Sequence, residues 1–319
     1  VLLHHAMGDV DGNVGSWGFA RGGMGSVAAA LSSSFQSLGG EIRTNSEVNQ
    51  IVVDGKTAKG VQLVSGEIIR ANAVVSNLDA KRTFLKLIDE KKLPSELSEK
   101  ARNFKIRGSS GKVNIALDGM PIFSALPKKS PLTLGHMHFS DTLERLERAY
   151  DDWKDDRWSA DPYVDMVIPT QYDPTMAPPG KHMMSVFVQY CPVSPEGGWD
   201  EKKKKEFGNT VINQIADYSP NFKDLILHAE IRTPHEIEKE VGLTEGNIFQ
   251  GELTLDQLMF NRPFPGYAQY RGPFKKMYMC SSSNHPGGGV MGAPGANAAR
   301  EILRDLKLQN TTPEDFGDD

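Results

Sequence analysis

The 319-residue sequence has no run of about 18 apolar residues, the length that a membrane-spanning helix needs. It also lacks a basic start followed by an apolar core, so it predicts no secretory signal peptide and favours a cytoplasmic protein, with peripheral membrane contact left open. Acidic residues (41) outnumber basic ones (36), and the net charge of −5 argues against a nucleic-acid partner. The two cysteines, Cys191 and Cys280, are far apart and predict neither a disulfide nor a metal motif.

A dinucleotide fingerprint is also missing, because no G-x-G-x-x-G follows a predicted strand. The glycines of "GGMGS" at 22–26 do not replace it, since no strand precedes them and no βαβ unit surrounds them. Two close histidine pairs have no cysteine or acidic residue at ligand spacing, so we predict no metal site: His4 with His5, and His136 with His138. The second pair would face one side of a strand, which leaves a role in a substrate pocket open.

The first 80 residues combine one amphipathic helix with short strands. Apolar side chains recur at steps of three and four between Met24 and Leu38, and Gly39 and Gly40 end the predicted helix. "VDGK" at 53–56 and "VSGE" at 64–67 predict two hairpin turns. "AVVSN" at 73–77 has the continuous apolar run of a buried strand.

The middle of the chain predicts a mainly antiparallel sheet flanked by helices. Alternating or apolar runs indicate strands at 111–118, 163–169, 183–190 and 225–233, and helical patterns occupy 80–104, 141–156 and 200–218. Thr233, Pro234 and Glu236 form the N-cap, first-turn proline and acid of a capping box. The expected fold class is therefore mixed, α+β with an α/β part.

A glycine-rich turn lies near the C-terminus. "MYMCSS" at 277–282 predicts a strand, "NHPGGGVMGAPG" follows it, and a helix begins near Ala293. Glycines let a backbone approach a ligand closely, and a helix N-terminus attracts an anion or a carbonyl oxygen. A tightly packed connection without a ligand would have the same pattern, so the residues alone leave both readings open. The acidic tail at 309–319 is predicted to be disordered.

These two ends together resemble the phytoene desaturase-like flavoproteins, a branch of the FAD-dependent amine oxidase and carotenoid desaturase superfamily. Residues 246–266, "GNIFQGELTLDQLMFNRPFPG", resemble the branch named for pyridine nucleotide-disulfide oxidoreductase domains. The resemblance implies that 1–80 is a later segment of a discontinuous FAD-binding domain and 81–270 a substrate-binding domain. Residues 271–308 would then be the C-terminal FAD-binding segment.

The resemblance also implies residues for an FAD site. Val48 matches a position whose backbone faces the adenine end of FAD, and Ser76 and Asn77 end a strand that runs toward the cofactor. The flavin ring and ribityl chain would lie along Ser281, Ser282, His285, Gly288, Gly289, Val290 and Met291. His285 is either a proton handler near the flavin or a structural residue of the Pro286 turn, and it is a weak catalytic candidate. No other catalytic residue is assigned.

The implied whole enzyme is a dehydrogenase or desaturase acting on an apolar small molecule. Residues 258–279, rich in aromatic side chains and methionine, would line its substrate channel or form ordinary core. Because the chain starts with valine and lacks the fingerprint, we expect a truncated piece of a longer protein, inactive and without FAD by itself. We also expect exposed apolar surface, leading to a dimer, aggregation or disorder of residues 1 to 20. A non-catalytic module that binds a lipid or a protein is the alternative.

Overall fold

The computed structural model describes residues 9–10, 12–16, 18–127, 130–139 and 142–307, which form two compact units. Unit 1 comprises the described residues of 1–42 and 108–241, and unit 2 those of 43–107 and 242–319. The predicted disorder at 309–319, and part of that at 1–20, concerns residues outside the described ranges.

Unit 1 is built on a five-stranded antiparallel sheet. Its strands stand in the order β11 (Ile226–Arg232), β7 (Ser110–Leu117), β10 (His182–Gln189), β9 (Tyr163–Val167) and β8 (Met137–His138). All four pairings are antiparallel. The side chains alternate between fully buried and half-buried along β7 and β10, as the sequence periodicity predicts. One sheet face therefore belongs to the core, and the other remains accessible.

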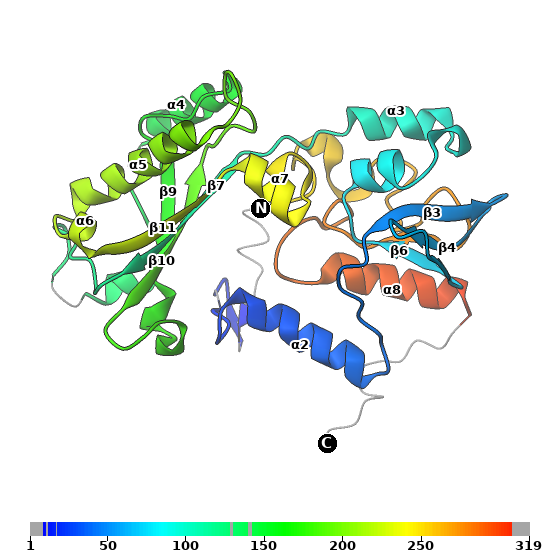
Figure 1. The fold of residues 1–319 in the computed structure, drawn as a ribbon, viewed down its shortest axis with the longest axis horizontal. Helices are drawn as coiled ribbons and strands as arrows, with labels where there is room; N and C mark the ends of the chain where they lie inside the picture. The colour runs from blue at the N-terminus through cyan, green and yellow to red at the C-terminus, as the bar shows by residue number, and fades with distance from the viewer. Residues whose placement is uncertain (1–8, 11, 17, 128–129, 140–141, 308–319) are drawn as a thin grey trace. The chain divides into compact units, whose positions relative to one another are not determined.

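Helix α5 (Glu201–Tyr218) covers the buried face (Figure 1). Phe207, Val211 and Ile215, one helical turn apart, are 0 % exposed. Gly208 allows the helix to lie close to β11, since a Cβ there would be 2.6 Å from the side chain of Ile231. The other α-helices of this part are α4 (Leu143–Lys154), α6 (Phe222–Leu225) and α7 (Pro234–Val241), and short 3₁₀ turns lie at Pro131–Leu134, Pro169–Gln171 and Pro174–Met176.

The predicted capping box opens α7, with Thr233 N–H donating to Glu236 Oε2 at 3.0 Å and Glu236 N–H donating to Thr233 Oγ1 at 3.4 Å. Both cysteines are free, as predicted.

The N-terminal part of unit 1 contains a short hairpin, β1 (Asp9–Val10) with β2 (Asn13–Val14), followed by helix α2 (Met24–Ser37). The helix forms where the apolar periodicity predicts it, but it has no buried residue. Leu31 and Leu38 are each 68 % exposed and Phe35 is 51 % exposed. The apolar pattern thus describes a face that is not buried within unit 1.

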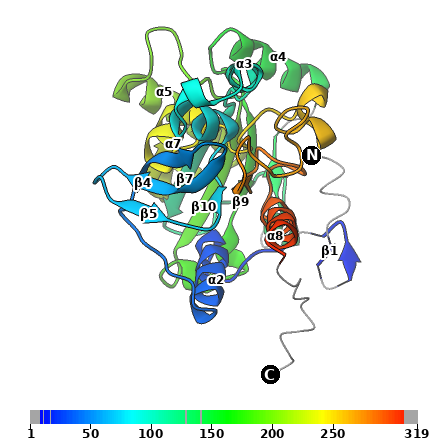
Figure 2. The same ribbon diagram turned by 90° about the vertical axis from the view of Figure 1, so that its right-hand side faces the viewer.

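Unit 2 contains two small sheets. Strands β3 (Val48–Asp54), β4 (Thr57–Leu63) and β5 (Ile68–Arg70) form an antiparallel meander joined by the two predicted turns (Figure 2). Strands β6 (Val74–Ser76) and β12 (Met277–Met279) pair in parallel, although about 200 residues separate them. Lys275 links the sheets, because its N–H donates to Lys56 O at 2.9 Å and its carbonyl accepts from Ala58 N at 3.0 Å. Helix α8 (Ala293–Asp305) follows β12.

The predicted helical stretch at 80–104 is divided into three pieces. A π-helix at Arg82–Lys86 and a 3₁₀ turn at Glu90–Lys92 precede α3 (Ser95–Asn103). The break has a local cause: the Asp89 carboxylate accepts the N–H of Lys91 at 3.1 Å, and Pro94 immediately precedes α3. Single 3₁₀ turns at Thr244–Gly246, Leu255–Gln257 and Met259–Asn261 complete the unit.

The boundaries of the compact units differ from the predicted domain boundaries at 80/81 and 270/271. Leu97, Phe104 and Phe264 belong to the same core as Ile51 and Met279, so the segments around them pack with the two small sheets. Most of the aromatic stretch at 258–279 is therefore core, although Met259 and Phe260 are 61 % and 76 % exposed.

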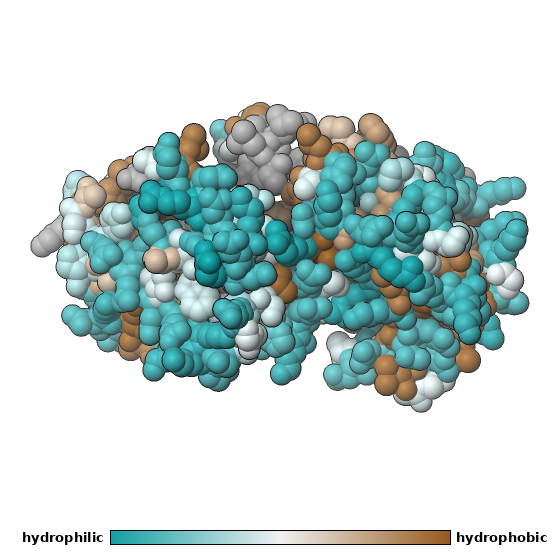
Figure 3. Space-filling model, turned by 90° about the horizontal axis from the view of Figure 1, so that it is seen from above, coloured by the Kyte–Doolittle hydropathy of each residue, from teal (hydrophilic) through white to brown (hydrophobic). Residues whose placement is uncertain are grey.

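The surface seen in Figure 3 is mainly hydrophilic, with separate hydrophobic spots. Among the described residues, no helix is long and apolar enough to cross a membrane. The mixed fold class with a mainly antiparallel sheet and flanking helices agrees with the prediction.

Candidate functional site

The parallel pair β6–β12 brings two distant predicted segments together. Cys280 N–H donates to Ser76 O at 2.9 Å, directly after the last strand pair, Met279 with Ser76. Ser76 and Ser281 are buried, and Asn77 is exposed beside them. Ligands of open α/β sheets bind at the carboxyl ends of parallel strands, so this edge is the candidate site.

A network of serine side chains holds the loop that follows β12. Ser283 Oγ accepts the N–H of Ala80 at 3.1 Å and donates to Gln250 O at 2.5 Å. Ser282 N–H donates to Gln250 Oε1 at 3.1 Å, and Ser283 N–H donates to Ser281 Oγ at 3.1 Å. The loop after β12 is thereby attached to the segment after β6 and to the loop at 250.

Arg262 anchors the same loop from within the core. Its guanidinium is 0 % exposed and forms five hydrogen bonds, all to backbone carbonyls. Nε donates to Ser282 O at 2.9 Å, and the terminal nitrogens donate to carbonyls of residues 249, 251, 252 and 257. Burial lowers the pKa of Arg262 to about 10, which leaves it protonated at neutral pH. A single cation thus satisfies the carbonyls of an irregular region.

Asn284 is the exception in this well-bonded loop. It is 0 % exposed, and neither its Oδ1 nor its Nδ2 has a hydrogen-bond partner among the described residues. A buried amide without partners costs about 1–3 kcal/mol, so native proteins rarely keep one without a function. The pair of unsatisfied atoms points to a ligand that exchanges hydrogen bonds with this side chain.

The glycine-rich turn ends at the N-terminus of α8. Gly292, the N-cap, is in the left-handed region (φ 65°), and no side chain caps the helix. The first N–H groups of the helix therefore remain available to an acceptor. Gly288 packs so closely that a Cβ would be 2.6 Å from the ring of Phe249, whereas Gly289, Val290 and Met291 are exposed. The turn is therefore closely packed at Gly288 and exposed from Gly289 to Met291.

His285 is held through its backbone, while the residue itself is exposed. The Tyr270 hydroxyl donates to His285 O at 2.8 Å and accepts from Asn297 Nδ2 at 2.9 Å, so it joins the turn to α8. Burial raises the pKa of Tyr270, which keeps the phenol in its donating form. This hydrogen bond holds the backbone of His285 in the turn and does not involve the imidazole ring.

Val48 is not among the residues that the β6–β12 edge brings together. It begins β3 and pairs with Leu63 in the separate meander.

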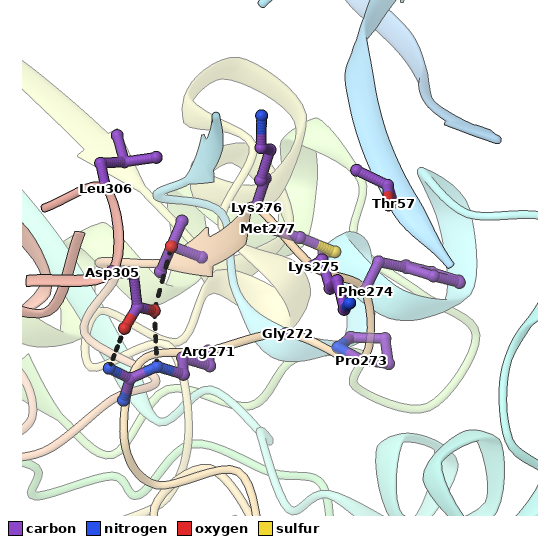
Figure 4. A pocket seen from close by; sticks show the side chains of 11 residues that line it. Thr57, Arg271, Gly272, Pro273, Phe274, Lys275, Lys276, Met277, Asp305 and Leu306 are labelled. Carbon is purple, nitrogen blue, oxygen red and sulfur yellow. Dashed lines mark hydrogen bonds and ion pairs between the residues drawn. The ribbon is translucent and has the colours of Figure 1, made fainter. Parts of the chain in front are cut away.

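A pocket of about 550 Å³ lies at the other end of β12 (Figure 4). Arg271 dominates it and forms a bidentate pair with Asp305, with both N–O distances 2.8 Å, and a further contact with Glu301 at 2.5 Å. The Tyr278 hydroxyl also donates to Asp305, at 3.1 Å. Arg271 and Asp305 are already paired with each other and join α8 to the segment before β12, so we take the loop as the candidate ligand site.

Arg262, Asn284 and Ser283 were missed by the sequence analysis. "NRPFPG" contains the arginine in a stretch interpreted as core or channel, and "SSSNHPGGG" contains the other two beside predicted residues. Their only sequence signal is polarity inside an otherwise apolar or glycine-rich segment. Among the described residues, no group of three or more His, Cys, Asp or Glu could hold a metal.

Comparisons with known proteins show which families and proteins this chain is similar to. The model of the family described as flavin containing amine oxidoreductase matches residues 3–303. A pyridine nucleotide-disulfide oxidoreductase domain-containing protein 2 from Rattus norvegicus is 39 % identical over 317 residues, covering 96 % of this chain and 54 % of the relative. The lycopene-forming phytoene desaturase of a Paracoccus species is 25 % identical, covering 92 % of this chain and 56 % of the relative.

Among solved structures, an oxidoreductase from Methanosarcina mazei shares the fold with a TM-score of 0.56 at 18 % identity, covering 89 % of this chain and 55 % of that one. The chain spans about half the length of the curated relatives that it matches. By the match across residues 3–303 and the 39 % identity, the chain belongs to the flavin-containing amine oxidoreductase family.

Proposed function

We propose that the whole protein, of which this chain is a part, is an FAD-dependent oxidoreductase of the dehydrogenase or desaturase type. The loop from Ser281 to Gly292 would form one wall of its flavin site. FAD supplies the electron acceptor, its isoalloxazine ring, so the protein has to bind, orient and shield the reacting groups.

The unpartnered amide of Asn284 carries this proposal. An isoalloxazine edge offers alternating carbonyl and N–H groups, which match an amide that both donates and accepts. Ser76 and Asn77 lie at the adjoining strand end, and the uncapped α8 N-terminus offers donors for a pyrimidine carbonyl. Val48, Ser282, His285, Gly288, Gly289, Val290 and Met291 remain proposed cofactor contacts.

Unit 1 would hold the substrate, an apolar small molecule, on the accessible face of its sheet. The chain without the rest of the protein would be inactive, because the resemblance assigns the pyrophosphate of FAD to a fingerprint segment that this sequence lacks. His285 stays the weak catalytic candidate, either as a proton handler or as a residue of the turn.

A non-catalytic binding module is the second candidate, and the exposed apolar face of α2 favours it. Such a face would also support a dimer. The two candidates differ in whether flavin is present in the native whole protein.

The test is the visible spectrum of the whole protein purified from its native source. The enzyme proposal expects bound flavin that is released as FAD on denaturation. It also expects the flavin absorbance to bleach when a cell extract containing the substrate is added without oxygen. A whole protein that contains no flavin and does not take up added FAD would overturn the proposal in favour of the binding module.

A further inference from the structure

Unit 1 has a pocket of about 700 Å³ on the accessible face of its sheet. This volume falls within the roughly 300–1,000 Å³ of small-molecule sites. Apolar side chains form most of its wall, including Met24, Met176 and Met183 and the rings of Phe19 and Tyr172, which stack at 4.6 Å between centroids. A hydrocarbon or aromatic body would fit this wall.

Polar groups gather at one end of the pocket, on the sheet itself. Lys112 of β7 and Ser185 of β10 are half-buried and in contact, with Nζ donating to Ser185 Oγ. His136 lines the pocket beside them, and its Nδ1 lies 3.0 and 3.2 Å from the two carboxylate oxygens of Asp165. The charge of the ligand that fits here depends on which of these groups still has hydrogen-bond donors or acceptors without a partner.

The carboxylates of Asp173, which lines the pocket, and of Asp165, which pairs with the lining residue His136, are already engaged. Both oxygens of Asp165 contact His136. Asp173 accepts from Gly22 N–H at 2.5 Å and from Thr175 Oγ1 and N–H at 2.5 and 3.1 Å, and these bonds lower its pKa. Neither acid therefore offers a free oxygen pair to an amine.

The ammonium of Lys112 has N–H donors that are not used by the described residues. It carries three N–H donors, and in the described part of the chain its one hydrogen bond is to Ser185. Burial lowers the pKa of Lys112, and the charge of Asp165 opposes this at longer range, since no ion pair joins the two among the described residues. The hydroxyl of Ser185 accepts from Lys112, so its own hydrogen is available as well. Arg21, which is exposed, adds positive charge at the pocket wall.

We propose that this pocket binds an apolar molecule through a single carboxylate, held by Lys112 and Ser185. The inference rests on the proposed function in one respect, because it names the substrate class that unit 1 would take. The half-buried lysine and its hydroxyl neighbour form a two-donor clamp that suits the two oxygens of a carboxylate. A fully apolar substrate would leave these donors unsatisfied, which costs affinity.

Binding to the chain itself, measured by calorimetry without FAD, tests the proposal. The probes are decanoate and decylamine below their micelle concentrations, and decan-1-ol below its solubility limit. We expect decanoate to bind with one-to-one stoichiometry and about tenfold tighter than decan-1-ol, because one charge-assisted contact is worth about that factor. Tightest binding of decylamine, equal binding of all three probes, or no binding of decanoate would each overturn the proposal.

Two variants locate the contact, and a third is their control. Lys112→Met and Ser185→Ala should each remove most of the preference for decanoate over decan-1-ol, while decan-1-ol binds as before. Lys181→Met changes a lysine just before β10 whose ion pair is with Asp118, outside the pocket, and it should keep the preference. Unchanged decanoate binding in folded Lys112→Met would contradict the assignment. Because no flavin is involved, failure here leaves the FAD proposal standing, and absence of FAD from the whole protein leaves this result standing.

Discussion

The two candidate sites of this molecule are built in opposite ways. In unit 2, the loop after β12 is held by backbone groups that a few buried polar side chains satisfy, above all Arg262 and Ser283. In unit 1, strands β7 and β10 carry Lys112 and Ser185, and these two side chains with His136 provide the chemistry of the pocket. The difference predicts where mutations affect stability: changes at the anchoring and tightly packed residues of the loop should damage the fold, whereas changes in the pocket should affect mainly binding.

The largest effect is expected for Arg262→Met. The substitution removes five hydrogen bonds and takes the side-chain donor from the carbonyls of residues 249, 251, 257 and 282, while Glu252 O keeps its bond from Gln257 Nε2. Each unsatisfied buried group costs about 1–3 kcal/mol, so the free energy of unfolding should fall by at least about 3 kcal/mol. Urea denaturation measures it.

Arg300→Met on α8 is the matched control, because Arg300 is exposed and its one hydrogen bond within the described ranges is to the side chain of Asn297. It should change the stability by less than about 0.5 kcal/mol. Equal effects of the two substitutions would contradict the anchoring role of Arg262.

Alanine substitutions at two glycines, one in the loop and one in α8, should have opposite effects on stability. At Gly288 a Cβ would lie 2.6 Å from the Phe249 ring and 3.1 Å from Phe249 Cα, so Gly288→Ala should cost about 1–3 kcal/mol. At Gly295, inside α8, a Cβ meets nothing within 4 Å, and Gly295→Ala should stabilise the chain by about 1 kcal/mol through helix propensity. Thermal melts of both variants test the opposite signs, and two destabilised variants would refute the packing described for the turn.

Much of unit 1 could be predicted because its information is local. The alternation of Val113, Ile115 and Leu117, and the spacing of Phe207 and Val211, repeat with the period of the element that each forms. The burial of the apolar faces of β7 and α5 could therefore be predicted as well. The same reasoning predicted helix α2, yet whether its apolar face is covered depends on surroundings that periodicity does not describe.

The candidate site was predictable only in part, for a physical reason. The neighbouring positions of Ser76 and Ser281 came from a family motif that spans strand, turn and helix. Arg262 and Asn284 act through burial and hydrogen bonds with residues distant in the chain, which no local pattern encodes. The carbonyls of an irregular backbone need individual hydrogen-bond donors. The side chains that supply these donors can therefore be identified only from the three-dimensional structure.

The smallest effect concerns pH and the pocket. The hydrogen bond to Asp165 raises the pKa of His136 above its ordinary value of 6.5. A raised folded-state pKa gives stabilisation that is complete below pH 6.5 and is lost as the pH rises through the folded pKa. His136→Gln should therefore cost more stability at pH 5.5 than at pH 8.5, by less than about 1 kcal/mol because the pair is partly exposed. Melting temperatures at the two pH values test it, and a difference that grows with pH would contradict the pairing.

Replacement of Asn284 by alanine tests most directly whether the loop of unit 2 is a flavin wall. In the chain alone, Asn284→Ala removes two unsatisfied buried atoms, so the free energy of unfolding should stay unchanged or rise by up to about 2 kcal/mol. In the whole protein, the same substitution should weaken FAD binding about tenfold or more, as measured by flavin fluorescence titration. A clear loss of stability in the chain, together with unchanged FAD affinity in the whole protein, would contradict the assignment.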